Sequence, residues 1–142
     1  MNVTKLLLAT LVGAVVNFLA GWLIYGMLLM DTMKNGMTEA AKAVMKGPGE
    51  EIIPLYFVSS VFAALMLAYI YERWAGIRTM VAGATAGTVI FMLMALNIDL
   101  GFMAGMNMFN GNSMLIVDVL VYGVFGALTG GAVGWMLGYN RN

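Results

Sequence analysis

The chain has 142 residues, of which 62% are hydrophobic and 10% charged, and its seven basic residues balance its seven acidic ones. Soluble domains carry about a quarter charged residues, so this composition predicts a membrane protein. The sequence contains no cysteine or histidine. These 142 residues therefore cannot form a disulfide, supply a thiolate nucleophile or bind zinc through its usual Cys and His ligands. A net charge of zero argues against nucleic acid as a partner, because such binding depends on clustered Lys and Arg.

Four stretches are long and apolar enough to cross a bilayer, which takes about 20 residues. The first follows Lys5, but its apolar run is too long for a signal peptide, whose apolar region spans about 7 to 15 residues. We therefore expect one all-α transmembrane domain over residues 1–142, built as a four-helix bundle. The predicted spans are Leu6 to Met30, Ile52 to Tyr71, Thr79 to Ile98 and Met114 to Gly138.

The connections between the spans differ in character. Asp31 to Glu51 holds half of the fourteen charges and has apolar residues at helical spacing, which predicts a short amphipathic helix over about residues 32–46 on the membrane surface. The second connection is a tight turn. The third, Asp99 to Asn112, lacks Lys and Arg but is rich in Gly and Asn. We expect it to fold back over the mouth of the bundle, where its backbone groups can find partners.

The distribution of Lys and Arg predicts the orientation, because cytoplasmic connections carry the excess of these residues. Four of them lie on the side of the two termini and three on the other side, which places both termini in the cytoplasm. We expect a multi-pass protein of a bacterial inner membrane. The two sets are Lys5, Arg73, Arg78 and Arg141 against Lys34, Lys42 and Lys46.

Each predicted span has a face of small residues, which allows helices to pack closely in lipid. In the last span, glycines recur at four-residue steps. They form either a glycine zipper between copies of the chain or a packing face within one chain, and we favour the second because four small faces satisfy one another. Asn17 is expected to hydrogen-bond across helices. The predicted packing residues are Gly13, Asn17, Gly21, Gly83, Gly87, Gly126, Gly130, Gly134 and Gly138.

Asp118 is the acid that lies well inside a predicted span. Inserting an Asp costs about 2.5 to 3.5 kcal/mol, which its Leu, Ile and Val neighbours roughly offset. Ionisable residues inside a membrane span are candidates for function. Because successive spans cross the membrane in opposite directions, further polar residues fall at the same depth as Asp118, in the outer half of the membrane. This predicts a ligand or ion pocket that faces away from the cytoplasm. Its predicted residues are Asp118, Tyr122, Asn97, Asp99, Ser59, Ser60 and Tyr25, with Tyr56 nearby.

Two interpretations of Asp118 stay open. The carboxylate binds a small cation, a proton or another ligand, or it is a structural acceptor that is bonded to a Tyr or Asn or paired with Lys34 near the interface.

Methionines and aromatic residues suggest two further roles. Met103, Met106 and Met108 cluster in the third connection, and thioethers are soft ligands that suit Cu(I). The alternative is that Met fills gaps, because the other methionines are spread along the chain. Tyr and Trp residues at the span ends are expected to anchor the helices at headgroup level. These aromatic residues are Tyr56, Tyr69, Tyr71, Trp74, Trp135 and Tyr139.

Two segments resemble a known family. In one, Gly21 is followed by Trp22 and Tyr25; in the other, Phe109 to Gly111 leads into Leu115 to Asp118 and a Gly-rich last span. This pattern resembles a family of small four-span bacterial integral membrane proteins described only as a domain of unknown function. The resemblance implies four spans and makes Asp118 a family feature, but it implies no activity.

Together these patterns predict a small transport, channel or ligand-binding membrane protein. The alternative is a non-catalytic accessory subunit of a larger membrane assembly, so the expected partners are the lipid bilayer and either further copies or other subunits. An enzyme is disfavoured, because the acid–base groups near the spans are Asp99, Asp118, Glu72 and tyrosines, with no nucleophile–base pair. We expect no cofactor.

Overall fold

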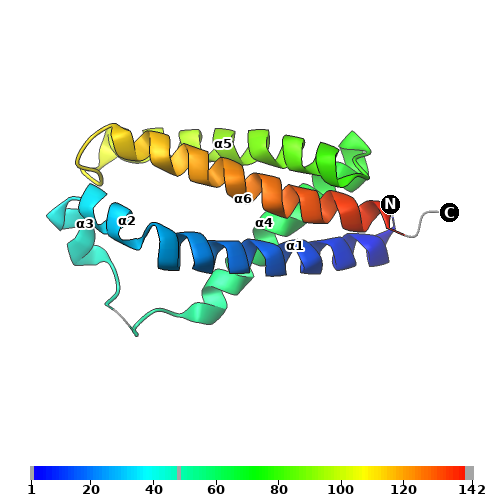
Figure 1. Cartoon of the computed structure of the whole chain (residues 1–142), viewed down its shortest axis with the longest axis horizontal. Coiled ribbons are helices and arrows are strands. Elements are labelled where there is room, and N and C mark those ends of the chain that lie inside the picture. The colour runs from blue at the N-terminus through cyan, green and yellow to red at the C-terminus, as the bar shows by residue number, and fades with distance from the viewer. Residues whose placement is uncertain (1, 48, 140–142) are drawn as a thin grey trace.

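Four long apolar helices dominate the structure, a computed structural model that describes residues 2–47 and 49–139 (Figure 1). Each is long and apolar enough to cross a membrane, and the chain is a multi-pass membrane protein with the four predicted spans. The four are α1 (Val3–Leu23) with its π-helical extension η1 (Ile24–Leu28), α4 (Ile53–Ile70) with its π-helical extension η2 (Tyr71–Ala75), α5 (Met80–Gly105) and α6 (Ser113–Gly138).

The third span is longer than predicted. Its start agrees with the sequence pattern, because Thr79 caps α5 by accepting a hydrogen bond from the Ala82 backbone N–H at 3.2 Å. However, α5 continues from Ile98 to Gly105, so Asp99 and Met103 belong to the helix and not to the third connection. The acid does not end the span because its side chain is buried against the bundle, at 5% exposure.

Glycines bring α5 and α6 into backbone contact. A Cβ atom added at Gly83 would collide with the carbonyl oxygen of Gly130, and one added at Gly87 would collide with that of Gly126. Further along the interface, Gly134 lies against the backbone of Thr79. The glycine face of the last span is therefore filled by α5 of the same chain, as the internal-packing interpretation requires.

The helix α6 also packs against α1 and α4. Asn17 of α1 donates a hydrogen bond from Nδ2 to Oγ1 of the fully buried Thr129 at 2.9 Å, which is the predicted interhelical bond. Gly13 leaves room for Val133 of α6 and Ala64 of α4. In Figure 1, α4 crosses behind α1 and α6, and its first turns diverge from them. The bundle is thus tight at the end where α1 begins and opens toward the end where α4 begins.

Tyr71 corrects one sequence-based expectation. It was expected to anchor its span at headgroup level, but its side chain is completely buried and donates a hydrogen bond to the carbonyl oxygen of Gly83 at 2.7 Å. The other aromatic residues expected at the span ends are exposed, at 40% for Tyr69 and 71% for Trp74. Tyr71 therefore fastens the end of α4 to the α5–α6 contact.

An ion pair and two hydrogen bonds close the end of the bundle where α1 begins. Arg78 pairs with Glu72, and Glu72 also accepts a hydrogen bond from the backbone N–H of Asn2 at 3.2 Å. Lys5 donates to the carbonyl oxygen of Tyr139 at 2.9 Å. The turn between η2 and α5 begins at Gly76, whose φ of +61° is a left-handed conformation that favours glycine.

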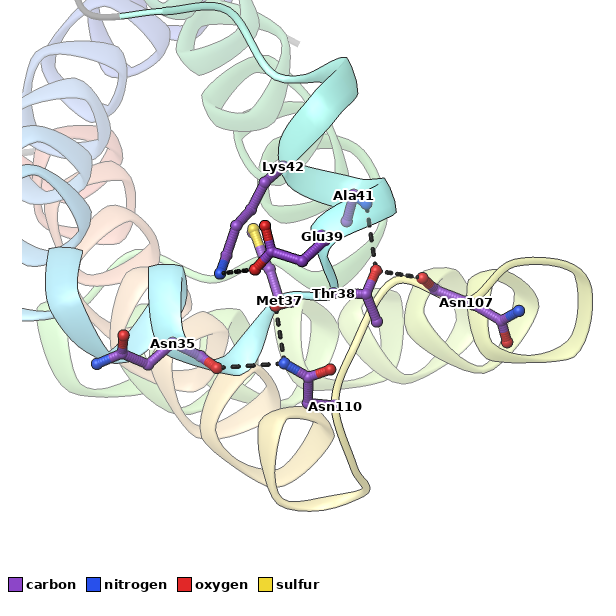
Figure 2. A network of polar contacts seen from close by, with 8 residues as sticks. All are labelled: Asn35, Met37, Thr38, Glu39, Ala41, Lys42, Asn107 and Asn110. Atoms are coloured by element: carbon purple, nitrogen blue, oxygen red, sulfur yellow. Dashed lines mark hydrogen bonds and ion pairs between the residues drawn. The ribbon is translucent and has the colours of Figure 1, made fainter.

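At the opposite end, the structure divides the predicted surface helix into α2 (Met30–Gly36) and α3 (Glu39–Val44). The backbone is extended between them because it pairs with the α5–α6 connection (Figure 2). The N–H of Thr38 donates to Met108 and that of Asn110 to Gly36, at 3.0 and 2.8 Å. The Asn110 side chain also donates to the carbonyl of Met37 at 2.8 Å. The third connection therefore folds back and finds backbone partners, as predicted.

We predict that Gly130→Leu lowers the free energy of unfolding of the purified protein by about 1–3 kcal/mol, the usual cost of overpacking, and so lowers its unfolding temperature. The new side chain would meet the Gly83 carbonyl and, at 2.7 Å from its Cβ, the Tyr71 hydroxyl. Thermal unfolding followed by circular dichroism in detergent measures the change. Gly101→Ala is the control, because a Cβ there meets nothing within 4 Å. On a sizing column we expect one species throughout; loss of a larger species in Gly130→Leu would instead indicate a zipper between copies.

Candidate functional site

A cavity of about 710 Å³ lies between α1, η1, α2 and the first turns of α4. We call it the large cavity. Most of its walls are apolar, aromatic or methionine side chains, such as Phe18, Trp22 and Met33. It exists because α4 diverges from α1 at this end of the bundle (Figure 1). Its polar lining residues are Asn17, Tyr25, Lys34, Glu51, Tyr56 and Ser60.

A second cavity of about 210 Å³, the small cavity, lies between α4, α5 and α6. Ser59 and Ala63 line it from α4, and Tyr122 lines it from α6. Asn17 and Phe125 border both cavities. The first half of α4 therefore borders a cavity on each of two sides. Asn17 and Phe125 lie between the two cavities and line both.

Tyr25 connects the large cavity to a buried acid. Its hydroxyl donates a hydrogen bond to Oδ1 of Asp118 at 2.7 Å, and its ring stacks on Phe125 with centroids 5.6 Å apart. Asp118 is 8% exposed and does not line the cavity itself. Tyr25 lies in η1, and single π-helical turns in helices occur frequently at functional sites. Tyr25 therefore links the wall of the large cavity to the buried carboxyl group of Asp118 through one hydrogen bond.

Asp118 also faces a second acid. Gly87 lies against Gly126, and one turn further Phe91 lies beside Tyr122 with ring centroids 6.5 Å apart. From this pair, Asp99 lies two turns further along α5 and Asp118 one turn further along α6, so the two acids are about one helical turn apart in level. Because side chains tilt toward the N-terminus of their own helix, the two carboxyl groups lean toward each other in this antiparallel pair. Asp99 and Asp118 are therefore neighbours across the α5–α6 interface. The site is therefore an acid pair between two helices, with Tyr25 on a third.

The structure distributes the predicted pocket residues over three places. Tyr25 and Ser60 line the large cavity, and Ser59 and Tyr122 line the small one. Asp118 and Asp99 lie buried behind Tyr25, between α5 and α6. Asn97 is exposed and lines neither cavity.

Helix geometry explains the separation of Asn97 from Asp99. The two residues are about 200° apart around α5, so only one of them can face the bundle. Lys34, the other partner considered for Asp118, lines the large cavity and forms no ion pair with either acid within the described residues.

Several lining residues of the large cavity were missed as site residues. Glu51 and Lys34 come from the first connection, where the sequence predicted an amphipathic helix on the membrane surface and named Lys34 only as a possible partner of Asp118. Asn17 was assigned to packing alone, although it both bonds Thr129 and borders the two cavities. These residues line one cavity because α4 diverges from α1, and no local sequence pattern indicates that divergence.

The three clustered methionines do not share one connection. Met103 lies in the last turns of α5, and Met106 follows that helix directly. Met108 lies in the connection, where its carbonyl accepts the hydrogen bond from Thr38. Cu(I) binding by these thioethers stays a prediction.

Comparison with known proteins identifies the family. The family described as "Protein of unknown function (DUF1761)" matches residues 8–111, which is most of the chain. The chain belongs to the DUF1761 family. No curated protein and no solved structure matches it. The DUF1761 match begins inside α1, includes α4 and α5, and ends before α6. Asp99 and Tyr25 lie inside the matched region, whereas Asp118 lies outside it.

We predict that Tyr25→Phe destabilises this DUF1761 protein by about 1.5–3 kcal/mol, the usual loss for a hydrogen bond to a charged group. The matched control is Tyr122→Phe, which deletes the same hydroxyl from a ring that forms no hydrogen bond within the described residues. Thermal unfolding of the three proteins in one detergent gives the comparison. Equal losses in both variants would show that the bond to Asp118 contributes little.

Proposed function

We propose that this DUF1761 protein binds a small amphipathic molecule in the large cavity. The observation that carries the proposal is Tyr25, which lines the cavity at membrane depth and whose hydroxyl is bonded to the buried Asp118. Ligand sites typically measure about 300–1,000 Å³ and combine apolar walls with a few polar groups, and the large cavity has these properties.

The lining supports a ligand that is apolar along most of its length. Phe18, Trp22 and Met33 would contact its apolar part, and Met side chains adapt to irregular ligands. Two polar zones border this surface. One lies near the middle of the first span, at Asn17, and the other contains Lys34 and Glu51, which belong to the charged connection. A ligand with a polar group at one end fits this division.

We further propose a binding or transport role and not an enzymatic one. A non-catalytic accessory subunit is the competing interpretation, and it would be favoured by a fully packed bundle. Two cavities beside the first half of α4 support the ligand-binding interpretation instead. The experiment below separates the two, because a subunit would co-purify with a partner chain and without a small molecule.

The proposed location is the inner membrane of a bacterium with both termini in the cytoplasm. The distribution of Lys and Arg supports this orientation. It places α2, α3 and the α5–α6 connection on the outer face, because these segments lie at the end opposite the start of α1 (Figure 1). The large cavity would then be reached from the outer half of the bilayer.

We predict that Ser60→Phe abolishes retention of a co-purified small molecule, because the new ring would occupy part of the large cavity, which Ser60 lines. Native mass spectrometry of the detergent-purified protein detects the bound mass. Val58→Phe is the control on the same helix, since Val58 is exposed and lines neither cavity. Equal retention in both variants, or no bound mass in the wild-type protein, would contradict the proposal. Circular dichroism checks that Ser60→Phe folds, and Tyr56→Ala serves as a second cavity variant.

The absence of cysteine from the chain makes its orientation directly measurable. We predict that Lys46→Cys reacts with a membrane-impermeant maleimide in spheroplasts, whereas Arg73→Cys reacts only after the membrane is permeabilised. Both positions are exposed, and they lie at opposite ends of the bundle. The reverse labelling pattern would place the termini outside.

A further inference from the structure

The acid pair formed by Asp99 and Asp118 has a property that ligand binding in the large cavity does not explain. Both side chains are more than nine-tenths buried, at 5% and 8% exposure, inside spans that cross lipid. Asp118 receives the hydrogen bond from Tyr25, but Oδ2 of Asp99 is buried without a partner. Buried polar atoms are nearly always hydrogen-bonded, so an unpartnered carboxyl oxygen indicates a missing ligand.

No positive charge compensates the pair within the described residues. The ion pairs there join Lys42 to Glu39 and Arg78 to Glu72, and neither involves Asp99 or Asp118. The titratable groups that face the pair are Tyr25 from η1 and Tyr122 from α6. Both are neutral hydroxyls, so two ionised carboxylates would place two uncompensated negative charges side by side in an apolar bundle.

Two neighbouring carboxylates that are both buried in such apolar surroundings cannot both stay ionised at a reasonable cost in free energy. A proton between them removes one charge and gives the unpartnered oxygen a hydrogen bond in the same step. The remaining negative charge is then stabilised by the donated bond from Tyr25 on the other side of Asp118.

We propose that Asp99 and Asp118 form a proton-binding site, which holds one exchangeable proton between the two carboxyl groups. The site lies one hydrogen bond from the large cavity, because Tyr25 contacts both. The proposal concerns the ligand-free protein, so it stands or fails independently of what occupies the cavity.

Infrared spectroscopy of the protein in lipid vesicles at neutral pH tests the site. We expect a protonated-carboxyl C=O band that corresponds to one group per chain, shifts in D₂O and disappears at high pH. Asp99→Asn and Asp118→Asn should each abolish it, because the remaining carboxylate then accepts a hydrogen bond from the new amide. Asp31→Asn, an exposed acid outside the spans, should leave it unchanged.

Two results would overturn the proposal. The first is a wild-type spectrum without the band, and this measurement needs no variant to fold. The second is a band that persists unchanged in one single variant, which would assign the proton to one carboxyl alone. A wild-type protein that lacks the band and gains thermal stability on addition of Na⁺ would show that the pair holds a metal cation instead.

Discussion

The backbone contact between α5 and α6 sets the positions of the other helices. Because neither Gly83 nor Gly130 has a side chain, the two helices approach until main-chain atoms touch. Their register brings Asp99 to within about one helical turn of Asp118, and it presents the Gly83 carbonyl to the hydroxyl of Tyr71. The acid pair and the attachment of α4 are therefore two consequences of the same close approach.

The sequence predicted the spans well because hydropathy is a local property that lipid imposes on every residue of a helix. It failed where a contact between residues far apart in the chain determines whether a side chain is buried or where a helix ends. Tyr71 has the sequence position of an interfacial anchor, but the π-helical turn η2 and the nearby Gly83 carbonyl bury it. The surface helix divides at Met37 because the strand-like contact with Phe109 competes with helical hydrogen bonds.

The candidate site could be predicted only in part. Depth along a span follows from counting residues, and this correctly selected Tyr25 and Asp118 as groups at one level. Facing direction near a span end was harder, since both Asn97 and Asp99 were assigned to the pocket, although Asn97 is exposed and only Asp99 is buried. Which of the two faces inward depends on the register of α5 against α6. The cavity itself depends on the divergence of α4, which follows from packing over the whole bundle.

The helix α6 also bears on how the protein is made. It is the most buried of the four spans: 44% of its apolar segment is buried inside the bundle, against 22–28% for the other three spans. It contacts α1, α4 and α5, yet it follows all three of them along the chain. During synthesis the first three spans therefore enter the bilayer without the partner that covers their small faces. Assembly of the bundle must wait for α6, and a chain truncated before Ser113 would leave these small-residue faces uncovered in the membrane.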